Sequence, residues 1–425
     1  MRQKKNNFKA AKKIFLSLIL CTALVLSTTG MVHAQEEPFW TYTGITHLYE
    51  NEIGGLTRVY IDNVNEDDPF IHVEDYDGAF VLQAKHEIPK ELGIYGNFYA
   101  GTVYNYLIFG QKNKAEDDSA EVIRVVKYSK NWERLGHASI YGANTTVPFD
   151  AGECRCVEAG GMLYVHTCHE MYKSRDGKNH QANMTFIVRV EDMEVTSIRA
   201  GVGFENTGYV SHSFDQYILA DKEGNVVTLD LGDAFPRAIV LSRYNGMVGR
   251  QRLYGVSSAI IQRIAGAIGD NNTKVRIGGF AETDTGYVTA YRYDGGAYLA
   301  YTSKNDLTTT STPFLPPKLG APTPVLVPRD TSGGYILWKE WTPDGEVLCY
   351  ASYSADGSIG EMHAVNCVVS TFGLLDSKAT YYNGKLVFCI CVGEQIPMTL
   401  QHCNKKLDFY LLDETGIETI SIPTT

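Results

Sequence analysis

The chain has 425 residues, of which 38 are Lys or Arg and 49 are Asp or Glu, and its formal net charge is −11. A net acidic chain without a cluster of Lys and Arg beyond its first residues argues against nucleic acid or anionic lipid as the main partner. Its length exceeds the about 250–300 residues that one hydrophobic core usually supports, which predicts either several domains or one repetitive architecture.

The first 34 residues have the pattern of a secretory signal peptide. Six basic residues precede an apolar run over 14–26, and Val32-His33-Ala34 offers the small residues of a cleavage site. The run of about 13 residues is shorter than the roughly 20 that span a bilayer, so a membrane anchor is the less favoured alternative. The long basic segment resembles Gram-positive bacterial signals. We expect a secreted or cell-surface protein whose mature chain, 35–425, has no integral membrane segment and a formal charge of 32 − 49 = −17.

Eight cysteines remain after the leader, and an even number in an exported chain favours disulfides. Cys154 and Cys168 flank the Gly160-Gly161 turn almost symmetrically, and Cys391 and Cys403 flank a later strand-to-strand loop, so both are predicted as cross-strand pairs. Buried free thiols are the alternative. The two Cys-x-Cys pairs lack the spacing of a zinc site, and the cysteines predict no metal.

Strand signals dominate from residue 40 onward. Runs such as 122–128 and 184–190 are rich in Val, Ile and aromatic residues, and Asp-Gly or Asn-Gly dipeptides typical of hairpin turns lie between such runs. No stretch has a sustained helical period; 257–268 comes nearest. A turn containing Gly or Asp, followed by an aromatic and β-branched run, recurs with a later spacing of about 50 residues. Its copies lie at 77–82, 160–165, 215–219, 285–289, 333–337 and 383–388.

Grouped by fours, the expected strands give seven units, cut near 40–88, 89–140, 141–200, 201–248, 249–312, 313–365 and 366–425. The third unit is predicted to have strands at 154–158, 162–172, 183–190 and 195–199. The fourth is predicted to have them at 209–214, 216–221, 225–231 and 237–244. This pattern predicts an all-β chain, folded over 35–425 as one β-propeller of four-stranded antiparallel blades, most simply seven, with six as the alternative count. A solenoid or a pair of β-sandwiches fits the recurring plan less well.

The mature chain therefore resembles the β-propeller class as a whole over nearly all of its length. It has no Trp-Asp signature of the WD40 repeats. Ser174-Arg175-Asp176-Gly177 and Ser354-Ala355-Asp356-Gly357 are similar to the start of the sialidase Asp box but lack its remaining residues, which favours plain hairpin turns. The resemblance implies a fold, and it indicates no catalytic residues and no cofactor.

Propeller geometry indicates one edge at which to look for a site. The loops between second and third strands open on the same face as the connections between blades, and in the third unit this loop, 173–181, is long and polar. If the strands are assigned to the correct blades, three histidines come together between the third and fourth units. Such a group of histidines suits proton transfer or metal ligation. Hydrogen bonding that only stabilises the blades is the alternative. The candidate catalytic residues are His169, His180, His212 and Tyr172. The candidate ligand-binding residues are His166, His169, Arg175, Asp176, Asn179, His180 and His212.

Three functions follow from these observations. The first is an exported module that binds an extracellular glycan or protein, which the 27 tyrosines support because exposed aromatic rings stack on sugars and anchor interfaces. The second is a glycan-active enzyme, of the polysaccharide lyase or glycoside hydrolase type, that uses the histidine edge. The third is a structural cell-surface protein.

Overall fold

The computed structural model describes residues 46–61, 68–204, 207–318, 321–342, 345–365, 377–395 and 402–423. In these residues all regular elements are strands, and none is a helix that could cross a membrane.

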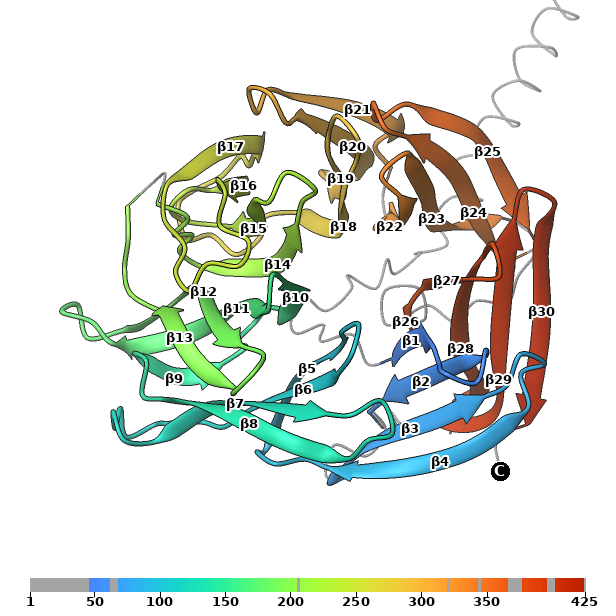
Figure 1. Cartoon of the computed structure of the whole chain (residues 1–425). Helices are drawn as coiled ribbons and strands as arrows, with labels where there is room; N and C mark the ends of the chain where they lie inside the picture. Colours follow the sequence, from blue (N-terminus) through green and yellow to red (C-terminus); the bar gives the residue numbers. More distant parts are fainter. Residues whose placement is uncertain are drawn as a thin grey trace, which may run out of the picture. The chain divides into compact units, whose positions relative to one another are not determined.

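Seven sheets, each with four consecutive antiparallel strands, follow one another around a ring (Figure 1). The first three blades are β1 (Thr46–Glu50), β2 (Leu56–Tyr60), β3 (Phe70–Tyr76) and β4 (Leu82–Pro89); β5 (Ile94–Ala100), β6 (Asn105–Gly110), β7 (Glu121–Tyr128) and β8 (Arg134–Tyr141); and β10 (Arg155–Ala159), β11 (Met162–Lys173), β12 (Asn179–Arg189) and β13 (Glu194–Arg199). Blades four and five are β14 (Ser213–Ala220), β15 (Val226–Gly232), β16 (Ala238–Tyr244) and β17 (Val256–Arg263); and β18 (Val275–Glu282), β19 (Gly286–Tyr293), β20 (Gly296–Ser303) and β21 (Thr309–Leu315). Blades six and seven are β22 (Val325–Asp330), β23 (Gly333–Thr342), β24 (Gly345–Ser354) and β25 (Ile359–Val365); and β27 (Thr380–Tyr382), β28 (Lys385–Gln395), β29 (His402–Asp413) and β30 (Gly416–Pro423). The predicted seven-bladed propeller is confirmed.

Two short strands lie outside this plan. β9 (Thr145–Pro148) pairs with the far end of β11, where His169 lies opposite Pro148. β26 (Ser377–Lys378) adds to the first blade.

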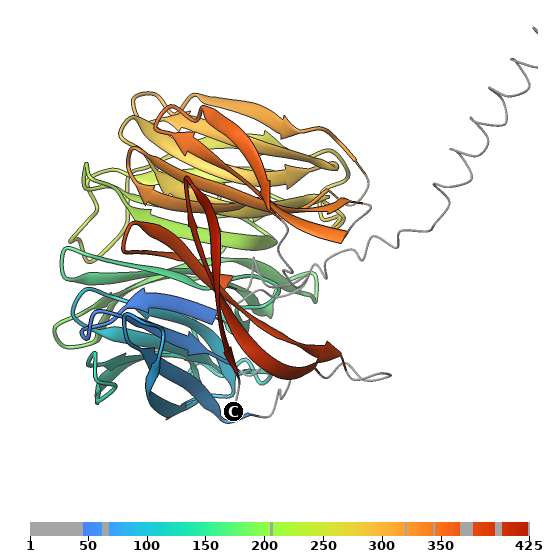
Figure 2. The ribbon, with the colours of Figure 1, turned by 90° about the vertical axis from the view of Figure 1, so that its right-hand side faces the viewer.

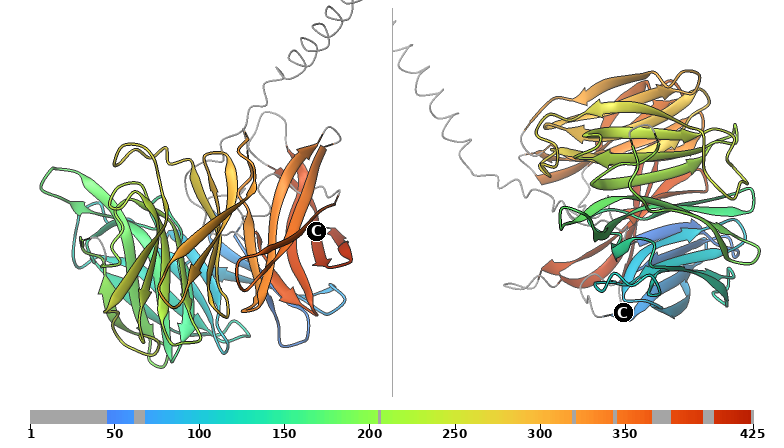
Figure 3. Two further views of the ribbon diagram at one scale, coloured as in Figure 1. Left: turned by 90° about the horizontal axis from the view of Figure 1, so that it is seen from above. Right: turned by 90° about the vertical axis from the view of Figure 1, so that its left-hand side faces the viewer.

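The hydrophobic core lies between neighbouring sheets, which pack face to face around the ring (Figure 3). In β11, Leu163 and Val165 belong to a cluster shared with the second blade, whereas Met162 and Tyr164 belong to one shared with the fourth. Successive residues of a strand point to opposite faces of the sheet. A strand in which odd- and even-numbered residues are both apolar can therefore pack against both neighbouring blades. This requirement explains why the strands are near-continuous apolar runs.

Several of the turns that the sequence predicts contain a glycine with positive φ. Gly161 (φ +76°), Gly177 (φ +81°) and Gly384 (φ +77°) occupy hairpin turns. Only glycine adopts this backbone region without strain, which accounts for the glycines at these turns.

In the described residues, blade seven consists of four strands from the C-terminal part of the chain, and no strand from the first blade is part of it. β26 pairs in parallel with β1 through Thr46–Ser377 and His47–Lys378. The Tyr382 hydroxyl donates a hydrogen bond to the Gly54 carbonyl at 2.7 Å. Figure 2 shows the seventh blade, in red, beside the first, in blue.

The fourth blade differs from its predicted plan. Residues 213–220 form one strand, not parts of two, so the predicted turn at Asp215 is wrong and β17, at 256–263, completes this blade. The strand is irregular between Ser213 and Gln216, and both side chains are buried and hydrogen-bonded. Buried polar residues at a strand irregularity have the composition of a turn, which explains the error.

The predicted Cys154–Cys168 disulfide is wrong, because both thiols are free and buried. Cys154 packs in the cluster shared with the second blade, whereas Cys168 has the parity of the β11 residues that face the fourth. The thiols therefore lie on opposite faces of the sheet. The side chains of Cys391 and Cys403 lie outside the described residues, but the backbone register sets Cys403 opposite Glu394 and Cys391 opposite Leu407.

Candidate functional site

Four connections gather at one face of the third and fourth blades. They are the β11–β12 turn, the β13–β14 and β17–β18 connections between blades, and the β15–β16 turn. Backbone hydrogen bonds join them: His212 N–H donates to Gln181 (2.8 Å), Ser211 N–H to Phe235 (3.1 Å) and Gly269 N–H to Asp233 (3.0 Å). We call the described residues of 173–181, 200–204, 207–212, 233–237 and 263–270 the blade-four loop face.

His180 and His212 meet on this face. Their rings stack with centroids 6.0 Å apart, and both side chains are about one-third exposed. Nε2 of His180 lies 2.8 Å from Oδ2 of Asp176, and Nδ1 of His212 lies 3.0 Å from Oδ1 of the fully buried Asp233. Each imidazole therefore has its own carboxylate. Hydrogen bonds from the Ser174 hydroxyl, from the Lys178 N–H and from His180 lower the pKa of Asp176.

The prediction placed His212 on the inner strand of the fourth unit, at 209–214. It lies instead in the connection that precedes β14. Its φ is +51°, a left-handed conformation that costs energy in a residue with a Cβ. The predicted long loop 173–181 is also shorter, because β11 extends to Lys173 and β12 begins at Asn179.

The structure does not bring His169 to this pair. His169 is fully buried, and its Nδ1 lies 2.7 Å from the Thr145 hydroxyl of β9. Burial lowers its pKa to about 4. This histidine is a part of the core between the strands of the third blade.

His166 is also buried, in a polar network between blades three and four. Its Nε2 lies 3.1 Å from Oδ1 of Asp230, and its Nδ1 lies 2.8 Å from the Thr185 hydroxyl. Ser213 donates to the same Asp230 oxygen at 2.8 Å. A serine nucleophile needs its hydroxyl on the histidine base, whereas here both groups bind the carboxylate. The network joins the two blades and gives no activated serine.

Of the remaining predicted residues, some contact a loop of the second blade and one is exposed to solvent. Tyr172 accepts a hydrogen bond from Asn113 at 3.1 Å, and Asn179 donates to Glu116 at 3.0 Å, so both hold the β11–β12 hairpin against a loop of the second blade. Arg175 is exposed at the tip of that hairpin. Across the described residues, no group of three or more His, Cys, Asp or Glu side chains could hold a metal ion.

The sequence analysis missed an apolar patch on the same face. Phe204 is 84% exposed, Val202 76%, Ile268 61% and Phe235 54%. Large exposed apolar side chains that form a contiguous patch mark interaction sites, and these four lie in connections on one face. The only signal in the sequence is that these residues stand in turn-rich segments where no strand can bury them.

A groove of about 180 Å³ adjoins the patch. Its lining includes Tyr209, Pro236, Ile260 and Arg263. The segment 202–204 lies close to this groove, since a Cβ added to Gly203 would come within 2.7 Å of the Cβ of Tyr209, which lines the groove. The patch and the groove therefore belong to one surface.

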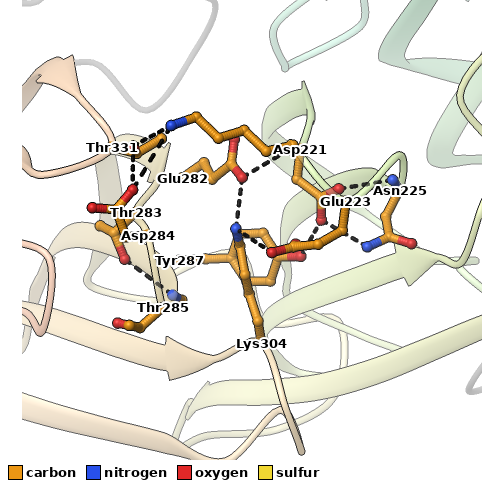
Figure 4. A network of polar contacts seen from close by, with 12 residues as sticks. Asp221, Glu223, Asn225, Glu282, Thr283, Asp284, Thr285, Tyr287, Lys304 and Thr331 are labelled. Carbon is orange, nitrogen blue, oxygen red and sulfur yellow. Dashed lines mark hydrogen bonds and ion pairs between the residues drawn. The ribbon is translucent and has the colours of Figure 1, made fainter.

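The opposite face of blades four to six holds a separate ion-pair network, which Figure 4 shows. The Lys304 ammonium lies 2.6 Å from Glu282 and 3.0 Å from Glu223, which come from different blades. The backbone N–H of Lys222 donates to Glu282 at 2.8 Å, and its ammonium donates to Thr331 at 2.5 Å. Each charged group here is matched within the protein, so we interpret the network as a clamp between blades.

Comparison with family models and with curated proteins gives no match. Among solved structures, BamB from Moraxella catarrhalis is 11% identical, with 89% of this chain and 87% of that chain covered and a TM-score of 0.41. The WD40 domain of SCAP from fission yeast is 8% identical over 91% and 89%, with a TM-score of 0.44. The α-L-arabinofuranosidase Arb93A from Fusarium graminearum is 10% identical over 74% and 94%, with a TM-score of 0.42. At these identities and scores none of them bears on function, which has to be argued from this chain's own residues.

Proposed function

We propose that this chain is an exported binding module that docks an acidic protein partner on the blade-four loop face. The observation that carries the proposal is the exposure of Phe204, Phe235 and Ile268 in connections of one face whose neighbouring residues Tyr209, Pro236 and Arg263 line a groove. Protein interfaces place aromatic and aliphatic anchors at their centre and surround them with polar groups. Here the anchors are flanked by His180 and His212 and by exposed charges.

The sign of those charges favours an acidic partner. The exposed charged residues among the described residues of the face are Lys173, Arg175, Lys178 and Arg263 against Asp176 and Asp270, and with Glu205 of the same connection the local charge is 4 − 3 = +1. The chain as a whole has a net charge of −11. A basic rim on an acidic protein selects a partner by complementary charge and speeds its encounter.

The composition of the patch favours a protein over a glycan. Phenylalanine, valine and isoleucine contribute apolar area but no hydrogen-bonding groups, and a sugar presents hydroxyls that need such groups when they are desolvated. The apolar side chains of a partner protein satisfy the patch without that cost.

A glycan-active enzyme that uses the same histidines is the alternative. It is supported by the paired His–Asp contacts of His180 and His212, which could hold or move a proton. That alternative predicts turnover of a glycan that H180A and H212A abolish while the fold is retained.

Selection of a displayed random-peptide library on the purified protein tests the docking proposal. We expect enrichment of peptides that combine Asp or Glu with apolar residues. Truncation of an interface anchor costs about 2 kcal/mol or more, so F204S and F235S should each weaken an enriched peptide by at least about thirtyfold in calorimetry.

M362S is the matched control. Met362 is an exposed apolar residue (47%) of the sixth blade, and its substitution should leave the affinity unchanged. Enriched peptides that bind F204S and F235S as tightly as the unmodified protein would contradict the proposal. Binding of glycans alone, with no peptide enriched, would favour the alternative.

A further inference from the structure

A second group of exposed apolar side chains lies on the face opposite the blade-four loop face. Ile53 is 60% exposed, Val103 57% and Val81 56%. They stand in the β1–β2, β5–β6 and β3–β4 turns, which open on the opposite face from the β11–β12 turn because successive strands of a blade run in opposite directions. With the β7–β8 turn, these turns make up the turn surface of blades one and two, which we define as residues 50–55, 77–81, 101–104 and 129–133.

Contacts join the four turns into one surface. A Cβ added to Gly78 would lie 3.2 Å from the Gly54 carbonyl oxygen, so the two turns of the first blade touch. The Lys130 ammonium donates to the Gly101 carbonyl at 2.5 Å, which joins the two turns of the second blade. The same ammonium lies 5.1 Å from the centre of the Tyr49 ring, near the end of β1, so the two blades also meet here.

The β3–β4 turn holds its apolar side chain outward on a fixed backbone. Oδ1 of Asp77 accepts the N–H groups of Ala79 and Val81 at 2.9 and 3.0 Å. Phe80 is buried, with its ring 5.0 Å from that of Phe409. One side chain of the turn therefore anchors it in the core while the next one faces solvent.

The β1–β2 turn is fixed in a similar way. The Asn51 amide donates to the Tyr76 carbonyl at 3.0 Å, and its oxygen accepts the Gly55 N–H at 2.8 Å. The Tyr382 hydroxyl donates to the Gly54 carbonyl at 2.7 Å. A surface that is already ordered loses less conformational entropy when a partner binds, so these turns are suited to docking.

Acidic side chains surround the apolar ones. Glu50, Glu52 and Glu133 are exposed, and in the described part of the chain their carboxylates form no hydrogen bond or ion pair. With Asp77 and Lys130, the local charge of the turn surface is 1 − 4 = −3. The network of Figure 4, on the same face of blades four to six, differs because its charged groups are matched within the protein.

The cation of this surface, Lys130, is engaged by neutral groups of the protein. Its ammonium donates to the Gly101 carbonyl and, at 3.0 Å, to the side-chain oxygen of Asn105. Burial lowers the pKa of Lys130, and the charges of Glu158 and Glu52 act against this effect. One half-buried ammonium does not balance the exposed carboxylates, so the surface presents an excess of negative charge to solvent.

A basic segment of a protein matches both properties of the surface. Its apolar side chains would remove Ile53, Val81 and Val103 from water, and Lys or Arg beside them would pair with the carboxylates. The net charge of the whole chain, −11, attracts the same partner and repels an anionic lipid surface. A small polyamine would meet the carboxylates but leave the three aliphatic side chains in water.

We propose that the turn surface of blades one and two docks a basic segment of a partner protein. The apolar side chains of that segment lie on the three exposed aliphatic residues, and its Lys or Arg side chains lie beside Glu50, Glu52 and Glu133. This surface is separate from the blade-four loop face and does not depend on a partner there. With both surfaces occupied, the chain joins an acidic partner on one face to a basic partner on the other.

Selection of a displayed random-peptide library on the F204S protein tests this surface, because that substitution weakens the blade-four loop face. We expect enrichment of peptides that combine Lys or Arg with apolar residues. In calorimetry with a synthesised enriched peptide, V81S and V103S should each weaken binding to the otherwise unmodified protein by at least about tenfold. Raising the salt from about 0.05 to 0.5 M should weaken the peptide less in E52Q than in the unmodified protein.

I198S and E361Q are the matched controls. Ile198, 41% exposed, and Glu361 lie on outer strands of the third and sixth blades, and neither substitution should change the affinity. F204S should not change it either, which separates this proposal from the one for the blade-four loop face. Thermal melting confirms that the variants, all at exposed positions, are folded. The proposal is overturned if no basic peptide is enriched, or if enriched peptides bind V81S and V103S as tightly as the unmodified protein.

Discussion

His169 is a neutral histidine whose tautomer follows from its neighbours. The Thr145 hydroxyl donates to the Ala143 carbonyl at 2.9 Å, so it accepts from Nδ1–H of His169 at 2.7 Å. In the described residues no donor reaches Nε2, which is left with its lone pair in the core. A proton added there would create a buried charge without a partner, and this is why burial lowers the pKa to about 4.

This lowered pKa predicts a loss of stability in acid. The unfolded chain binds the proton near pH 6.5 and the folded chain only near pH 4, so stability falls as the pH falls through that window. We expect His169 to contribute a loss of about 2 kcal/mol in the free energy of unfolding between pH 7.5 and pH 5. Urea unfolding at several pH values measures it.

H169Q should make the free energy of unfolding depend less on pH between pH 7.5 and pH 5, because the substitution removes the titrating group. H137Q, at an exposed histidine, is the control and should leave the profile as it is. An unchanged slope in H169Q would show that His169 is not the titrating group.

At the scale of elements, the clamp between blades four and five depends on Lys304. Its side chain is 8% exposed, and that of Glu282 is 12% exposed. Burial alone would lower the pKa of Lys304, but hydrogen bonds to Glu282 and Glu223 outweigh it and raise the pKa. The raised pKa contributes stability that is fully present below the pKa of lysine in the unfolded chain and is lost as the pH rises through the folded pKa.

K304M should lower the free energy of unfolding by about 3 kcal/mol near pH 7, because it leaves Glu282 with a largely buried charge and one cation fewer. K222M removes an ammonium that is 65% exposed and should cost less than about 1 kcal/mol. Urea unfolding of both variants tests this. Equal losses for the two would mean that the clamp does not depend on the buried lysine.

Elements set by local chemistry were predictable from the sequence. Near-continuous apolar runs, separated by Gly-containing turns, determine each hairpin within about 20 residues, and four such strands recur in every blade. The fourth blade shows the limit: its inner strand buries Ser213 and Gln216, which bond Asp230 of β15 and the Glu153 N–H of the third blade, so its polar composition was interpreted as a turn.

The sites depend on distant residues, and this is why they were predicted only in part. The meeting of His180 with His212 follows from blade phasing and was anticipated, but the burial of His169 follows from β9, a strand outside the repeat. The turn surface of blades one and two joins residues as far apart as Ile53 and Glu133, which no local pattern connects.

At the scale of the whole molecule, blades seven and one are the neighbouring blades that do not follow one another in the chain. In the described part of the chain β26 provides two paired positions with β1, and side-chain packing adds to them in holding the ring closed. Phe409 is the centre of that packing, fully buried, with its ring 5.1 Å from Tyr76 and 5.0 Å from Phe80 of the first blade.

F409A should therefore weaken closure as well as stability. Truncating a buried phenylalanine costs about 3–5 kcal/mol, and we expect amide exchange to accelerate in β1, β2, β28 and β29 together. F186A removes an equally buried ring between the second and third blades, which the chain connects directly, and should accelerate exchange near that interface only. Hydrogen exchange measured by mass spectrometry compares the two variants. If F409A left the exchange of β1 and β2 unchanged, the ring would have to be held closed by contacts other than those around Phe409.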